Sequence, residues 1–295
     1  MVEFLVNLVN GLSLGSVYAI IALGYTMVYG IAKMLNFAHG DVIMIGAYTA
    51  YVGLRSLNLP APAAILGSMM ICTLLGMLIE RAAYKPLRQA TSLAVLITAI
   101  GVSYFLQNVA QLIWGATPIN YPSEFITLPG LSLLGGQLNI EGSTLVTILT
   151  GAVVMVGLSL FINRTKMGKA MRCVSEDRGA AELMGINVNR TIAVTFAIGS
   201  ALAAVAGVLL WAKVYKLEPT TGALPGIKAF TAAVLGGIGS IPGAMLGGVL
   251  LGLIEIFGRA YVSTALSDAI VFSVLIIVLL VRPTGLLGKP VREKV

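Results

Sequence analysis

The segment 36–41 places polar side chains, one of them acidic and one a histidine, directly between two apolar stretches. Asp41 fits the first turn of a following helix, where the helix dipole favours a carboxylate. If the segment lies at membrane depth, its irregular backbone needs protein or a water-filled cavity around it. Two interpretations are open: a cytoplasmic turn with a capping aspartate, or the border of a translocation path. For the second, the candidate path residues are Asn36, Phe37, His39, Gly40 and Asp41.

A second irregular segment, 235–252, is rich in glycine and contains one proline. Glycine and proline interrupt a helix, and small residues spaced by four, such as Gly239, Gly243 and Gly247, let neighbouring helices approach closely. Paired breaks in corresponding places of two halves point to a substrate site near the membrane midplane. Close helix packing alone is the alternative explanation for the glycines. The candidate path residues here are Gly236, Gly237, Gly239 and Ser240.

The connection 163–190 is long and basic. We expect a short helix in it that is capped by Ser175, has Glu176 and Asp177 in its first turn, and ends at Gly185. Leu183 and neighbouring small residues would give this helix an apolar face that fits a groove on a partner. A solvated loop, or a segment that lies on the bilayer, is equally compatible with the sequence.

Composition places these segments in an integral membrane protein. Of 295 residues, 58% are apolar and only 11% are charged, whereas about 25% of the residues in a soluble domain are charged. The apolar content excludes a disordered chain, and two cysteines do not build a disulfide scaffold.

Charge-free apolar windows long enough to cross a bilayer recur along the chain, and none of them alternates as a β-barrel strand does. We therefore predict an all-α fold: a polytopic transmembrane helix bundle of about 8–9 spans, with broken helices and a cytoplasmic coupling helix, in a single domain over residues 1–295. The seventh span is short and interrupted by glycine, so a re-entrant element is also compatible there. The expected spans are 4–31, 40–56, 62–81, 92–114, 143–162, 191–213, 224–238, 240–259 and 265–282.

The basic residues predict the orientation of these spans. If the chain crosses nine times, all but five of the 19 Lys and Arg residues fall on one side, which the positive-inside rule makes the cytoplasm. The amino terminus is then outside and the carboxyl terminus inside. The net charge of +7 reflects topology and attraction to lipid, not binding of nucleic acid. The five exceptions are Arg55, Lys213, Lys216, Lys228 and Arg259.

Ionisable residues inside the spans are scarce. Glu255 lies four residues before Arg259, so the two can pair on one helix face; a buried, functional acid is the other interpretation. An intramembrane enzyme needs paired acids, a Ser/His couple or a metal cluster, which one histidine and a single acid in segment 36–41 do not supply. We therefore predict neither catalytic residues nor a metal site. A channel or secondary transporter, a more remote alternative, would need ionisable groups in several spans.

Nucleotide chemistry must also come from elsewhere, since the sequence contains no G-x-x-x-x-G-K-[ST] phosphate-binding loop. The pattern Ala180-Ala181-x-x-x-Gly185-Ile186, preceded by Glu176 and Asp177, resembles the cytoplasmic loop of ABC importer permeases that docks on the ATPase. Gly179 departs from that pattern, because a larger residue is expected there. Together with segments 36–41, 228–240 and 282–288, this loop is similar to the branched-chain amino acid permease family, specifically its smaller, H-type subunit, over about residues 4–290.

The resemblance implies a bacterial importer in the inner membrane, in which this chain pairs with a second permease subunit. Two cytoplasmic ATPase subunits would bind ATP and Mg, so this chain would hold no cofactor, and a periplasmic binding protein would deliver leucine, isoleucine or valine. Relatives of this type carry urea or short-chain amides, which is the alternative substrate class. The residues expected to couple to the ATPase are Arg172, Glu176, Asp177, Ala180, Ala181 and Gly185.

Overall fold

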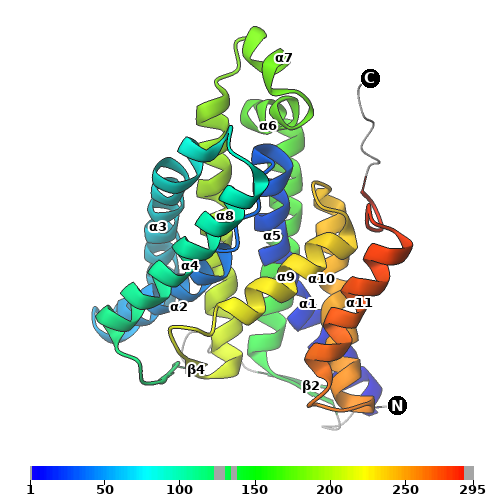
Figure 1. The fold of residues 1–295 in the computed structure, drawn as a ribbon. Coiled ribbons are helices and arrows are strands. Elements are labelled where there is room, and N and C mark those ends of the chain that lie inside the picture. The colour runs from blue at the N-terminus through cyan, green and yellow to red at the C-terminus, as the bar shows by residue number, and fades with distance from the viewer. Residues whose placement is uncertain (1, 123–129, 134–137, 289–295) are drawn as a thin grey trace.

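The computed structural model describes residues 2–122, 130–133 and 138–288, and these residues form a helical bundle (Figure 1). The expected positions of Lys289, Arg292 and Lys294 on the cytoplasmic side lie outside the described residues. The helices of the bundle are α1 (Val2–Ala32), α2 (His39–Arg55), α3 (Ala61–Ile79), α4 (Ser92–Trp114), α5 (Gly142–Arg164), α8 (Val188–Val214), α9 (Ala223–Gly236), α10 (Ile241–Tyr261) and α11 (Ser267–Val281).

These nine helices lie where the apolar windows predicted spans, with ends that differ by a few residues. Six segments are long and apolar enough to cross a membrane: α1, α3 with its continuation to Leu87, α4, α5, α8 and α10. The other three are shorter, with 17 residues in α2, 14 in α9 and 15 in α11. The prediction of a short seventh element is therefore confirmed by α9, although the glycines at 236 and 237 end this helix and do not interrupt it. The chain is a polytopic helical membrane protein.

Helix α1 runs through the centre of the bundle and contacts α5, α8, α9 and α10. Its residues from Tyr18 to Leu23 are almost fully buried. The approach to α10 is close because glycines face each other: a Cβ atom added to Gly252 would lie 2.2 Å from the backbone nitrogen of Gly15. Small residues allow such backbone contact between membrane helices, which gain van der Waals packing from it.

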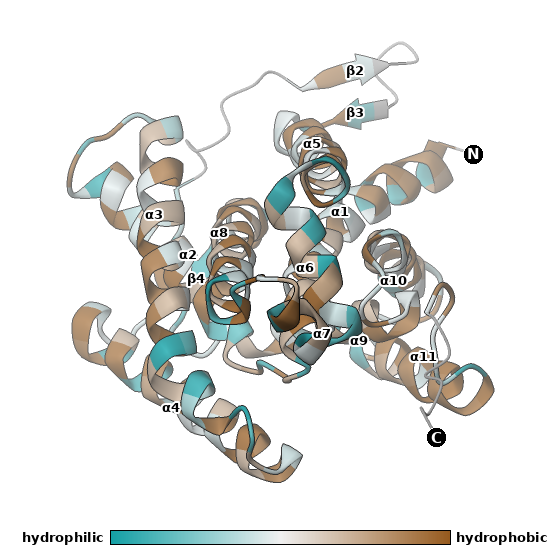
Figure 2. Ribbon diagram, turned by 90° about the horizontal axis from the view of Figure 1, so that it is seen from above, coloured by the Kyte–Doolittle hydropathy of each residue, from teal (hydrophilic) through white to brown (hydrophobic). Residues whose placement is uncertain are grey.

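The outer helices present apolar side chains to their surroundings instead of burying them. Only 28% of the apolar window of α4 and 22% of that of α5 is buried, against 67% for the inner helix α8. Figure 2 shows hydrophobic residues on the outward sides of α3, α4 and α11. Such surfaces are stable in lipid, whose chains are as apolar as leucine.

The two ends of the bundle differ. At one end lie α6 (Lys166–Glu176) and α7 (Arg178–Leu183), which form the connection between α5 and α8. The opposite end carries the start of α1 and two short antiparallel pairings (Figure 1). In these, β1 (Ile119–Asn120) pairs with β4 (Lys216–Leu217), and β2 (Leu131–Leu133) pairs with β3 (Leu138–Ile140).

The predicted cap of the connecting helix is wrong. Ser175 lies inside α6, where its hydroxyl donates to the Arg172 carbonyl, and Glu176 is the last residue of α6. Asp177 is the N-cap of α7, because its side chain accepts a hydrogen bond from the Ala180 backbone nitrogen at 3.0 Å. A serine that bonds its own preceding turn is not available as a cap.

Candidate functional site

The first break lies between α1 and α2. Helix α1 ends at Ala32, and Lys33 follows in the left-handed region with φ 54°. The polar side chains after it are buried against protein. The Tyr84 hydroxyl donates to Asn36 Oδ1 at 2.9 Å, and the His39 ring packs edge-on against Tyr25 with centroids 4.7 Å apart. The break therefore lies inside the bundle, where protein surrounds its irregular backbone.

Asp41 lies in the first turn of α2, as the sequence predicted, and its side chain is buried. Its Oδ1 atom accepts a hydrogen bond from Gln107 Nε2 of α4 at 2.9 Å. Phe37 contacts Phe230 of α9, with ring centroids 5.6 Å apart. Gly40 faces the same helix, since a Cβ atom there would lie 3.3 Å from the Gly226 Cα.

The second break lies between α9 and α10. Gly236 ends α9, and Gly237 and Gly239 adopt φ values of +104° and +93°, which other residues rarely adopt. Ser240 caps α10 by accepting from the Gly243 nitrogen at 3.2 Å. The segment after α11 closes on this break, since the backbone nitrogen of Leu287 donates to the Gly236 carbonyl at 2.9 Å.

The structure brings the two breaks together. A Cβ atom on Gly30, near the end of α1, would lie 3.2 Å from the Cα of Gly239. A small pocket lies between the breaks, lined by Tyr25, Tyr29, Leu35, Asn36, Phe230, Ala233 and Ile238. Aromatic and aliphatic residues dominate this lining, and Asn36 is its one amide residue. Of the path residues predicted from the sequence, Asn36 lines this pocket, and Gly239 lies beside the end of α1.

A polar band on α4 escaped the sequence analysis. Tyr104, Asn108 and Gln111 are exposed, although they lie in the second half of an otherwise apolar helix. Ser103 and Gln107 form the edge of the band, and Gln107 connects it to Asp41. The spacing of three and four residues puts these side chains on one face. A face of this kind fits a neighbouring protein or water better than lipid.

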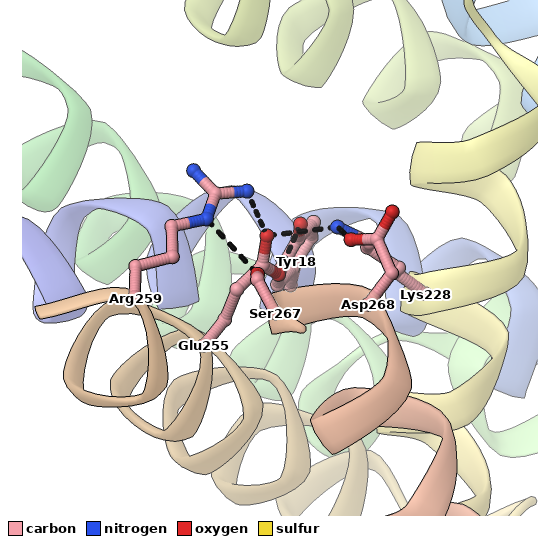
Figure 3. Close-up of polar contacts among 6 residues, drawn as sticks. All are labelled: Tyr18, Lys228, Glu255, Arg259, Ser267 and Asp268. Carbon is pink, nitrogen blue, oxygen red and sulfur yellow. Dashed lines mark hydrogen bonds and ion pairs between the residues drawn. The ribbon is translucent and has the colours of Figure 1, made fainter. Parts of the chain in front are cut away.

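A second group is the ion-pair cluster formed by Tyr18, Lys228, Glu255, Arg259, Ser267 and Asp268 (Figure 3). Of its contacts, only the pairing of Glu255 with Arg259 was predicted from the sequence, and it is confirmed. Glu255 is fully buried, yet it accepts from Tyr18 Oη at 2.7 Å, from Lys228 Nζ at 2.8 Å and from Arg259. The cluster continues to α11, because Lys228 also contacts Asp268 Oδ1 at 2.6 Å and Arg259 Nε donates to Ser267 at 3.0 Å. Two acidic and two basic groups balance each other, which a buried charge requires.

The cluster combines features of both interpretations of Glu255. The pairing with Arg259 exists, but Glu255 is also a fully buried acid that joins helices α1, α9 and α10. Lys228 lies inside α9 with 6% exposure, within the expected span 224–238, so its buried charge does not belong to the count of basic residues on the outer side. The signal in the sequence that could have revealed the whole cluster is that several charged residues fall in or beside apolar windows.

The connecting helices α6 and α7 form the outermost part of one end of the bundle (Figure 1). Arg172, Glu176 and Ala180 are exposed there, whereas Ala181 is buried against the rest of the chain. Gly185 ends α7 with φ +79°. Leu183 and Met184, at the tip of α7, are 90% and 82% exposed. This end therefore carries an uncovered apolar tip, of the kind that binds another protein.

One more contact joins this end to the first break: the Arg178 guanidinium donates to the carbonyl of Ala32, the last residue of α1. Arg178 is not among the coupling residues predicted from the sequence, because nothing distinguishes it there from the other basic residues of the loop.

A family model described as "Branched-chain amino acid transport system / permease component" matches residues 7–279. The chain belongs to this family. It is 50% identical to the high-affinity branched-chain amino acid transport system permease protein BraD of Pseudomonas aeruginosa, over 99% of this chain and 98% of that protein. The corresponding permease LivH of Escherichia coli is 47% identical over the same shares.

The chain also has more distant similarities. The ribose import permease protein RbsC of Escherichia coli is 27% identical over 84% of this chain and 76% of that protein. Among solved structures, a chain of PsaBC from Streptococcus pneumoniae in complex with Fab has a TM-score of 0.50 and 15% identity, with 93% of this chain and 91% of that chain covered. The latter similarity supports the fold alone.

Proposed function

We propose that this chain is the membrane-spanning permease subunit of an ATP-driven ABC importer that moves leucine, isoleucine and valine across the bacterial inner membrane. The observation that carries the proposal is the similarity to BraD and LivH along nearly the whole length of both chains. On this proposal the chain is a transport subunit and not an enzyme. ATP and Mg belong to partner ATPase subunits.

The translocation path on this proposal passes the pocket between the two breaks. In this structure the pocket has a volume of about 10 Å³, room for about one water molecule, so on this proposal it widens when an amino acid passes. Its mostly apolar lining would then contact an aliphatic side chain. The path candidates remain Asn36, Phe37, His39, Gly40, Asp41, Gly236, Gly237, Gly239 and Ser240. The polar band on α4 faces the second permease subunit, so that its side chains line the path between the two subunits.

The proposed coupling surface is the α6–α7 end. Arg172, Glu176, Asp177, Ala180, Ala181 and Gly185 lie there, and the exposed Leu183 and Met184 provide an apolar contact for an ATPase subunit. This end is then cytoplasmic, and the start of α1 at the opposite end is periplasmic, where a substrate-binding protein docks. Both assignments agree with the distribution of basic residues.

In the proposed mechanism, the two ATPase subunits close when they bind ATP and displace α6 and α7. The helices around the two breaks then tilt, and the central pocket changes from outward to inward access. ATP shifts this equilibrium only to the extent that it binds the two states differently. The hinge points are the breaks themselves, since non-helical residues absorb a change in direction without the loss of helical hydrogen bonds.

Co-purification without crosslinker, followed by identification of the associated chains and uptake assays with labelled leucine and urea, tests this proposal. We expect one further permease, two ATPase copies and leucine uptake. Uptake of urea but not of leucine by the purified complex would show that the importer belongs to the alternative substrate class, urea and short-chain amides.

Gly185→Trp tests the coupling surface, because a side chain at φ +79° strains the end of α7. A Cβ atom there meets no atom within 4 Å, so the fold has room for the residue and membrane insertion is expected to continue. ATPase association and leucine uptake are expected to be lost. Normal uptake by this variant would refute the docking role.

A further inference from the structure

Arg178 differs from every other charged residue of its connection. Between residues 164 and 190, a stretch that is described in full, the other charged side chains are all exposed, whereas Arg178 is half-buried. It is the first residue of α7 and points back toward the bundle, where it reaches the carbonyl of Ala32. An arginine that serves only solubility would extend into water, so this orientation calls for a specific explanation.

The contact with Ala32 is chemically well matched. The last four carbonyl groups of a helix have no donor within that helix, and a cation at this end is favoured by the helix dipole. Burial, together with the nearby Arg88, lowers the pKa of the Arg178 guanidinium from its ordinary value. The charge-assisted hydrogen bond to the Ala32 carbonyl offsets part of the cost of burying this charge.

The two elements joined are the ones that the proposed mechanism must connect. Helix α7 packs against α6 and α8, and Arg178 adds a direct connection to α1. Ala32 is the last residue before the first break, and Tyr29, one turn earlier, lines the pocket together with Leu35 and Asn36 beyond the break. A displacement of α7 therefore pulls on the backbone at one edge of the pocket.

We propose that Arg178 is the positioning residue that transmits movement of the ATPase-coupling helix to the α1–α2 break. This inference rests on the proposed function. Arg178 touches neither nucleotide nor substrate; it acts through the Ala32 carbonyl. While the contact is intact, a displacement of α7 acts directly on the end of α1. Without it, α7 reaches α1 only through its neighbours, such as α6, which packs against both.

The experiment uses the whole importer in proteoliposomes and measures leucine uptake and ATP hydrolysis in the same preparation. Arg178→Met removes the donor but keeps a long apolar stem. Assembly and ATP hydrolysis are expected to persist, while leucine transported per ATP falls by about tenfold, the size expected for the loss of one hydrogen bond to a charged donor. Arg178→Lys keeps a charged donor and restores part of the ratio.

Arg190→Met is the matched control, because Arg190 carries the same charge nearby, in the first turn of α8, but is exposed. It leaves the ratio unchanged. The inference is overturned if Arg178→Met transports as much leucine per ATP as the parent, or if it lowers assembly, hydrolysis and uptake equally, as a purely structural residue would. If the unaltered importer shows no ATP-driven leucine uptake, the proposed function itself fails, and that result is visible before any variant is compared.

Discussion

The ion-pair cluster gives the sharpest prediction on stability, through the substitution Lys228→Met. The methionine fills a similar volume, but it removes the ammonium group that lies 2.8 Å from Glu255 Oε1. The side chain of Glu255 is fully buried, and that of Lys228 is only 8% exposed. Without the ammonium group, the Glu255 carboxylate stays buried and loses part of the positive charge that compensates it. Removal of one partner of a buried ion pair is strongly destabilising for this reason.

The size of the destabilisation depends on the hydrogen bonds that Glu255 keeps in the variant. Tyr18 and Arg259 still donate to Glu255, so we expect the lower end of the range for a broken buried pair, about 3 kcal/mol. This corresponds to a fall of about 6–12 °C in the midpoint of thermal unfolding for a chain of this size. Arg259→Met removes a partner that is 42% exposed and is expected to cost less than about 1 kcal/mol.

The assay is thermal unfolding of the detergent-purified chain, followed by the fraction that remains monodisperse. The decisive comparison adds Glu255→Gln to Lys228→Met. With no buried charge left to compensate, the double variant is expected to regain at least half of the lost midpoint. If Lys228→Met unfolds at the parental temperature, or if the double variant is less stable than the single one, the reasoning about the cluster is wrong.

Two further substitutions test other contacts. Gly252→Leu adds a side chain whose Cβ atom alone would lie 2.2 Å from the Gly15 nitrogen, so the amount of folded protein in the membrane fraction is expected to fall sharply. Gly101→Leu is the control, because a Cβ atom added there would meet nothing within 4 Å. Asp177→Ala removes the cap of α7 at a cost of about 1 kcal/mol, and leucine uptake per ATP is expected to fall, whereas Asp177→Asn retains the cap and the uptake. Equal uptake by the alanine and asparagine variants would contradict the role of this cap.

The helices were predictable because each consists of a long apolar stretch whose ends are marked by polar residues or glycine. The position of the break before His39 and the short length of α9 followed from the same local signals. The cap of α7 was misplaced by two residues, since Ser175 and Asp177 are both good capping residues. The choice between them depends on where α6 ends, and that is set by its packing against α5 and α8.

The groups that sequence reasoning missed depend on contacts between distant segments. Tyr18 and Glu255 are 237 positions apart, and Arg178 and Ala32 are 146 apart. A pattern within one helix does not report such pairs, because the local sequence around one member carries no information about its partner. The α4 band was different: five polar residues fall within the second half of an apolar span and share one face. Attention to polar residues within spans, and not only to charged ones, would have found it.

The central claim is that this chain forms the conduit of an importer whose energy comes from ATPase partners. The most direct measurement is uptake of labelled leucine into proteoliposomes that contain the permease subunits and the ATPases, with the binding protein outside and ATP inside. The account predicts accumulation against a gradient that requires all components and stops when ATP is omitted. Leucine flux that is equally fast without ATP, in vesicles that contain this chain alone, would contradict it.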